Sequence, residues 1–182
     1  MSTIRLNVPT ILTFSRIILI PFFVLITPAS PILGVTIFLI ASLTDFLDGY
    51  LARRSGQITK FGIILDPIAD KFLVISALIL LVDMSRIAAW IAIAIIVREF
   101  LVTAIRVVAL SMDIVIPAET GGKWKTAAQM TSIVFLLLPY SIDFLPFSID
   151  FYDIGLVLMY ISLVLAVTSG VKYTISFWRH FQ

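Results

Sequence analysis

The stretch that decides the fold is residues 32–51, ILGVTIFLIASLTDFLDGYL. Twenty residues form a helix about 30 Å long, which matches the hydrocarbon thickness of a bilayer. In hydrocarbon, the backbone polar groups of such a segment must be satisfied within the segment itself. We therefore expect this stretch to be a transmembrane helix.

The whole chain shares this apolar character. Of its 182 residues, 60% are hydrophobic and 13% are charged, and the mean hydropathy is +1.12. So few charged side chains cannot cover a water-facing surface, which excludes a soluble globular enzyme and makes lipid the outer solvent. The lack of cysteine excludes disulfides, thiolate metal sites and cysteine nucleophiles, and a net charge of +2 is too small to indicate nucleic-acid binding.

Apolar segments recur along the chain, separated by short turns. They cover residues 11–26, 32–51, 68–82, 87–110, 124–140 and 154–178. We predict an all-α, polytopic membrane protein with six transmembrane helices, in which residues 1–182 form a single integral-membrane domain. Pro21 is expected to bend the first helix instead of ending it.

Positive charge is divided unevenly between the two membrane faces. If the six helices alternate in direction, one face carries Arg5, Arg53, Arg54, Lys60, Lys123, Lys125, Lys172 and Arg179, and the other carries Arg86. Cytoplasmic loops are enriched in Lys and Arg. We therefore expect the protein in the cytoplasmic (inner) membrane, with both termini and the active site on the cytoplasmic side.

Four aspartates lie where apolar residues are expected. Asp45 and Asp48 belong to the second segment, and Asp66 and Asp70 lie at the start of the third. A helix advances about 100° per residue, so each pair can face one cleft. Four converging carboxylates would repel one another unless cations were present, and their hard oxygen atoms suit Mg²⁺, Mn²⁺ or Ca²⁺, with two ions expected.

The neighbours of these acids have two interpretations each. Gly49, Ala52 and Gly62 let membrane helices pack closely, or they leave room for a substrate beside the metals. Arg53 pairs with a phosphate, or its side chain extends to the membrane surface. Asp66 also precedes Pro67, as an N-cap residue precedes a proline at the first helical position.

Together these residues form a pattern, Asp45-x2-Asp48-Gly49-x2-Ala52-Arg53-x8-Gly62-x3-Asp66-x3-Asp70. It resembles, at every defined position, the motif of the CDP-alcohol phosphatidyltransferase family. Other stretches resemble the phosphatidylglycerophosphate synthase branch of that family: residues 7–10 with Thr13 and Arg16, residues 97–100 with Arg106, and residues 122–126.

This resemblance implies a six-helix enzyme, usually a homodimer, that transfers a phosphatidyl group from CDP-diacylglycerol to an alcohol and releases CMP. By position, it implies a metal site for Mg²⁺ or Mn²⁺ and a binding site for CDP. The metal ligands would be Asp45, Asp48, Asp66 and Asp70, with Asp70 also the catalytic general base, and Gly49, Ala52, Arg53 and Gly62 would lie along the CDP. Direct displacement is favoured, and a covalent phosphatidyl-enzyme stays open.

Positive charge within the later segments predicts the acceptor. Arg98 and Arg106 lie in the fourth segment with Glu99 between them. Glu99 shares a face with Arg106, so one interpretation is a structural ion pair through a bridging neighbour. Together with Lys123 and Lys125, however, the arginines outnumber the nearby acid, and surplus cations within a membrane call for an anionic ligand. We predict that these four cations bind the phosphate of the acceptor.

Glycerol 3-phosphate is the acceptor that fits this charge. The predicted products are phosphatidylglycerol phosphate and CMP, and the predicted partners are both substrates, membrane lipid and a second copy of the chain, with no nucleic acid. Inositol phosphate or phosphatidylglycerol is the alternative acceptor. A cation channel or transporter is the alternative class of protein, but a path for cations gains nothing from Arg98 and Arg106.

Overall fold

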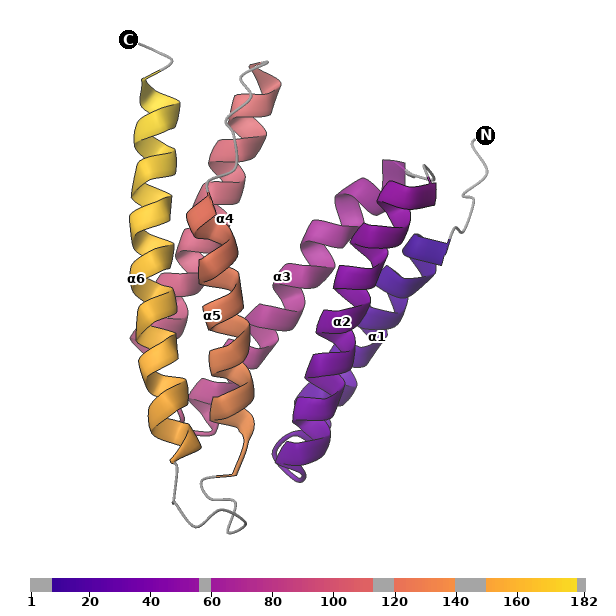
Figure 1. Ribbon diagram of the computed structural model, residues 1–182, viewed down its shortest axis with the longest axis vertical. Coiled ribbons are helices and arrows are strands. Elements are labelled where there is room, and N and C mark those ends of the chain that lie inside the picture. Colours follow the sequence, from indigo (N-terminus) through magenta and orange to yellow (C-terminus); the bar gives the residue numbers. More distant parts are fainter. Residues whose placement is uncertain (1–7, 56–59, 113–119, 140–149, 180–182) are drawn as a thin grey trace. The chain divides into compact units, whose positions relative to one another are not determined.

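The computed structural model describes residues 8–55, 60–112, 120–139 and 150–179. Over these ranges the secondary structure is helical throughout, in six helices (Figure 1). They are α1 (Val8–Ile26), α2 (Pro31–Ser55), α3 (Lys60–Asp83), α4 (Ala89–Ser111), α5 (Thr120–Leu137) and α6 (Phe151–Trp178). The predicted all-α fold is confirmed, and Pro21 lies inside α1 without ending it, as expected.

The helices form two compact units. The first contains α1, α2 and α3 as far as Leu80, and the second contains the end of α3 with α4, α6 and α5 as far as Leu136. The four aspartates of the sequence pattern belong to the first unit. Arg98, Glu99, Arg106 and the lysines of α5 belong to the second.

In the first unit, α1 and α2 pack side by side (Figure 1). The rings of Phe23 and Phe38 meet at a centroid distance of 5.8 Å, and both side chains are fully buried. Gly34 permits a close approach, because a Cβ at that position would overlap the side chain of Thr27. The Thr27 hydroxyl donates to the carbonyl of Phe23 at 2.5 Å, so this buried polar group stays satisfied within its own helix.

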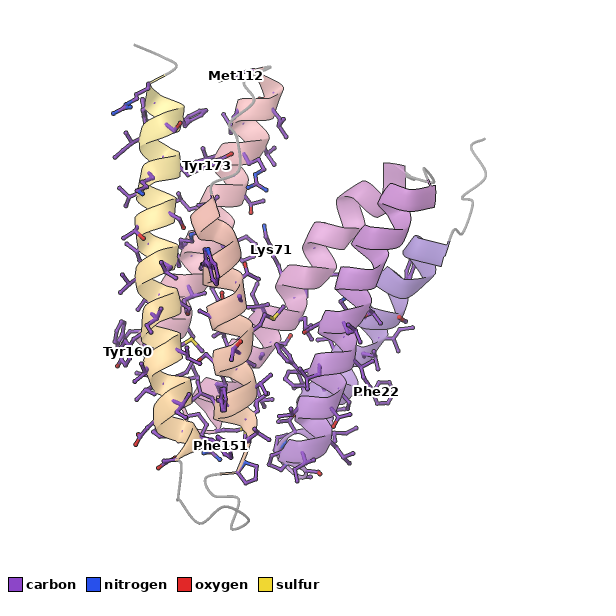
Figure 2. The ribbon with its side chains drawn as sticks, in the orientation of Figure 1. Phe22, Lys71, Met112, Phe151, Tyr160 and Tyr173 are labelled. Atoms are coloured by element: carbon purple, nitrogen blue, oxygen red, sulfur yellow. The ribbon has the colours of Figure 1, made fainter. Side chains whose placement is uncertain are left out.

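In the second unit, α4 and α6 run in the same direction. The Trp90 and Tyr160 rings lie 6.3 Å apart near the beginnings of these helices. Further along both, the Arg106 guanidinium lies 5.8 Å from the centre of the Tyr173 ring, on the side of α6 that faces α4 (Figure 2). The second contact lies later in the sequence than the first on both helices, so α4 and α6 are parallel.

Helix α5 runs in the opposite direction to α6. The Ser132 hydroxyl donates to the carbonyl of Gly155 at 2.6 Å. One turn further along α5, the ring of Phe135 meets that of Phe151, which precedes Gly155 in α6, at 5.5 Å. The alternation of α4, α5 and α6 agrees with consecutive spans that cross a membrane.

The described surface has the character expected of a protein in lipid. Large apolar side chains are exposed on both units, among them Leu25 (76%), Val107 (61%) and Val164 (60%). By length and composition, α6 alone among the described helices passes as a membrane span, and the apolar parts found in α1 and α2, Phe14–Ile26 and Pro31–Thr44, are shorter. Charged residues interrupt the apolar sequence of α4, and they belong to the candidate site.

Candidate active site

The predicted donor site combines α2 and α3. Helix α2 continues without a break to Ser55, so Asp45 and Asp48 lie on one regular helix together with Gly49, Ala52 and Arg53. The helical spacing assumed for these residues is therefore confirmed, and it keeps the acids within an arc of about 100°. Their side chains lie outside the described residues, as do those of Asp66 and Asp70. The convergence of the carboxylates stays a prediction.

Helix α3 begins earlier than the sequence suggested. It starts at Lys60, so Asp66 lies in the second turn and Pro67 is inside the helix. The expected N-cap role of Asp66 is wrong. Proline has no amide hydrogen, so Pro67 leaves the carbonyl of Ile63 without its usual partner four residues on. Gly62, Asp66 and Asp70 instead follow one another at single-turn spacing.

The metal site depends on the same four carboxylates. Among the residues whose side chains the structure describes, no three or more His, Cys, Asp or Glu residues are grouped closely enough to hold an ion. The carboxylates of Asp45, Asp48, Asp66 and Asp70 fall outside that part of the chain. Carboxylate oxygens are ligands that suit Mg²⁺ or Mn²⁺. Two of the four acids lie on α2 and two on α3, as the second and third apolar segments predicted.

The predicted acceptor site is described in more detail, and its centre is Glu99. One carboxylate oxygen, Oε1, accepts from Arg98 Nη1 at 3.1 Å and also from the ammonium group of Lys125 on α5. The exposed fractions of the side chains are 15% for Arg98, 20% for Glu99 and 6% for Lys125. The structure therefore brings two of the four predicted cations together on a single, partly buried acid.

Helix α6 holds the other side of Arg98. The Arg98 Nε donates to the carbonyl of Ala166 at 2.8 Å, and Nη2 donates to the hydroxyl of Ser169 at 2.5 Å. Gly170 lies against the same side chain. Sequence analysis missed these residues of α6, although a serine followed by a glycine in an apolar helix is typical of a close helix contact.

Arg106 has a different environment from Arg98. Its side chain is exposed, and its guanidinium lies over the Tyr173 ring. One of the two interpretations of Glu99 is a structural ion pair with Arg106 through a bridging neighbour. In the structure, Glu99 instead pairs with Arg98 on its own helix and with Lys125 on α5. The side chain of Lys123 lies outside the described residues, so its predicted role stays open.

The Glu99–Lys125 contact sets the register of the antiparallel helices α4 and α5. Arg106 lies seven residues beyond Glu99, or about 10 Å, and Thr120 lies five residues before Lys125, or about 8 Å in the same direction. Arg106 is therefore level with the first turn of α5. The free backbone amides and partial positive charge of a helix N-terminus favour an anion there.

A cavity separates α4 and α6 on another face of Arg98. Its volume is about 320 Å³, and it is lined by apolar side chains together with Arg98, Gly170 and Thr174. The Arg98 side chain thus lies between an apolar cavity and the ion pairs with Glu99.

Residues 6–168 match the model of the CDP-alcohol phosphatidyltransferase family. Three curated relatives are named CDP-diacylglycerol–glycerol-3-phosphate 3-phosphatidyltransferase. The one from Haemophilus influenzae is 44% identical over 75% of this chain and 78% of its own, and the one from Bacillus subtilis is 42% identical over 72% and 77%. The one from Escherichia coli K12 is 41% identical over 73% of this chain and 78% of its own.

A solved structure shares the fold. The crystal structure of apo phosphatidylinositol phosphate synthase from Mycobacterium tuberculosis matches with a TM-score of 0.69, covering 96% of this chain and 90% of that one at 17% sequence identity. At this identity the likeness shows the fold alone. The match of sequence to the family model over residues 6–168 decides the classification. The chain belongs to the CDP-alcohol phosphatidyltransferase family.

Proposed function

We propose that this protein is a membrane enzyme that transfers the phosphatidyl group of CDP-diacylglycerol to glycerol 3-phosphate. The products are phosphatidylglycerol phosphate and CMP. A relative that is 44% identical in sequence is named for this reaction. The observation that carries the choice of acceptor is the basic environment at α4 and α5, where Arg98, Lys125 and Arg106 exceed the charge of Glu99.

The donor half of the reaction belongs to α2 and α3. Asp45, Asp48, Asp66 and Asp70 would hold two Mg²⁺ or Mn²⁺ ions, which neutralise the charge of a pyrophosphate when bound. Gly49, Ala52, Arg53 and Gly62 would lie along the CDP moiety. The two regular helices support this proposal, because they keep each acid in register with its small neighbours.

The acceptor half belongs to α4 and α5. Arg106 and the first turn of α5 form the open part of the basic region, where a phosphate dianion can approach. Lys123 would join them from the first turn of α5. Arg98 and Lys125 lie deeper, where both contact Glu99, and their positive charges would attract the same phosphate.

The chemistry requires one proton transfer and one displacement at phosphorus. The Asp70 carboxylate accepts the proton of the primary hydroxyl of glycerol 3-phosphate. The hydroxyl oxygen bonds to the phosphorus that carries diacylglycerol, while the bond from that phosphorus to the CMP oxygen breaks. CMP leaves with the bonding electrons, and direct displacement needs no covalent enzyme intermediate.

The proposal includes a location and an assembly. The Lys and Arg asymmetry supports the cytoplasmic membrane, with both termini and the active site on the cytoplasmic side. The chain would act as one integral-membrane domain, because the family match spans both compact units, and it would form homodimers.

The experiment that tests the function measures release of labelled CMP from CDP-diacylglycerol by the purified protein with Mg²⁺ or Mn²⁺. Glycerol 3-phosphate, inositol phosphate and phosphatidylglycerol are supplied in turn as acceptors. We expect phosphatidylglycerol phosphate to form only with the first. A preference for inositol phosphate would reassign the acceptor, and metal-dependent ion flux in vesicles without CMP release would indicate a channel or transporter.

A further inference from the structure

The setting of Arg98 shows that α6 controls where its guanidinium lies. Nε is fixed by the carbonyl of Ala166 at 2.8 Å and Nη2 by the Ser169 hydroxyl at 2.5 Å, while Nη1 reaches Glu99 at 3.1 Å. A guanidinium has five N–H donors, so its three contacts with the described residues leave two donors for a ligand. The side chain is thus held in one orientation and can still donate to a bound anion.

Gly170 brings α6 close to this side chain. A Cβ at position 170 would lie 3.3 Å from both Cγ and Nε of Arg98, which is closer than ordinary van der Waals contact. A side chain at this position therefore requires Arg98 to shift by a few tenths of an ångström. Such a shift would change the contacts of its guanidinium with Ala166 and Ser169.

We propose that Ser169 and Gly170 are positioning residues that set the affinity for the acceptor through Arg98. This inference rests on the proposed function, in which Arg98 binds the phosphate of the acceptor. Both residues follow the segment that matches the family model, which ends at residue 168. A binding group that is already fixed loses less conformational freedom when its ligand arrives.

A purely structural link between helices does not need a buried cation. The same unit joins α5 to α6 through the Ser132 hydroxyl and the carbonyl of Gly155, at 2.6 Å and without any charge. Placing a guanidinium within a membrane protein carries a desolvation penalty that this neutral link avoids. An anionic ligand would account for the charge of Arg98 in addition to its pair with Glu99, and the contacts with α6 would orient the guanidinium toward that ligand.

The experiment compares Ser169→Ala and Gly170→Ala in the full-length protein in mixed micelles, with glycerol 3-phosphate and CDP-diacylglycerol titrated separately. We expect the KM for glycerol 3-phosphate to rise roughly 3- to 10-fold, the effect of one hydrogen bond. The KM for CDP-diacylglycerol should not change. The matched control is Ser162→Ala, since this buried serine of α6 contacts the carbonyl and the sulfur of Met159 in its own helix.

A double-mutant cycle separates positioning from general stability. In an Arg98→Gln background, Ser169→Ala should have no further effect on the KM for glycerol 3-phosphate, because the group that it positions is gone. An equal effect in both backgrounds, or no effect in the parent, would overturn the inference. If Arg98→Gln itself left this KM unchanged, the acceptor assignment in the proposed function would fail first and the inference with it.

Discussion

Replacing Glu99 with glutamine removes a negative charge and keeps the shape of the side chain. Its Oε1 accepts from both Arg98 and Lys125, whose side chains are 15% and 6% exposed. Breaking a buried ion pair by neutralising one partner costs about 3–5 kcal/mol. Glu99 itself is 20% exposed, and an amide oxygen still accepts a hydrogen bond, so we expect a loss at the lower end, about 3 kcal/mol.

The assay is the apparent melting temperature in detergent, followed by tryptophan fluorescence. For a chain of this size, a loss of about 3 kcal/mol lowers the melting temperature by roughly 6–12 °C. The matched control is Asp83→Asn, the same chemical change at an exposed residue near the end of α3. Surface changes of this kind usually alter stability by less than about 0.5 kcal/mol.

A second variant tests the cause of this loss. Glu99→Gln combined with Lys125→Met removes the acid together with one cation, so less uncompensated charge stays buried. We expect most of the lost stability to return, while the KM for glycerol 3-phosphate should rise above that of the parent protein because a cation of the acceptor site is missing. If Glu99→Gln alone has the same melting temperature as the parent protein, the shared ion pair does not stabilise the fold and the reasoning is refuted.

Four other outcomes are expected. Asp70→Asn should abolish CMP release while equilibrium binding of CDP-diacylglycerol persists, and near-normal turnover would remove Asp70 as the base. Arg106→Gln should raise the KM for glycerol 3-phosphate about 10- to 150-fold through loss of a charge-assisted contact, whereas a weakened donor instead would move this cation to the CDP site. Chelation with EDTA should stop CMP release and added Mg²⁺ or Mn²⁺ should restore it; activity that survives chelation would contradict the metal site. In intact cells, external thiol reagents should label Ser30→Cys and Ser148→Cys but not Gln57→Cys, and the opposite pattern would invert the topology.

Much of the fold could be predicted from the sequence because it depends on local properties. A segment in lipid must satisfy its own backbone, so long apolar runs become helices, and all six appear in the structure. The spacing of Asp45, Asp48, Asp66 and Asp70 already identified the family, since residues on a helix keep a fixed angular relation. Hydropathy failed at the start of α3, where polar residues and Pro67 interrupt a helix that continues through them.

The partners of the charged side chains were decided by tertiary structure. Spacing along one helix suggested that Glu99 belongs with Arg106, but the packing of α5 against α4 brings Lys125 to the carboxylate instead. The contacts of Arg98 with Ala166 and Ser169 join residues 68 and 71 positions apart. Periodicity reports which face of a helix a residue occupies and carries no information on which helix that face meets. The apolar residues of α6 therefore predicted a membrane span, and only its packing against α4 revealed that it positions an arginine.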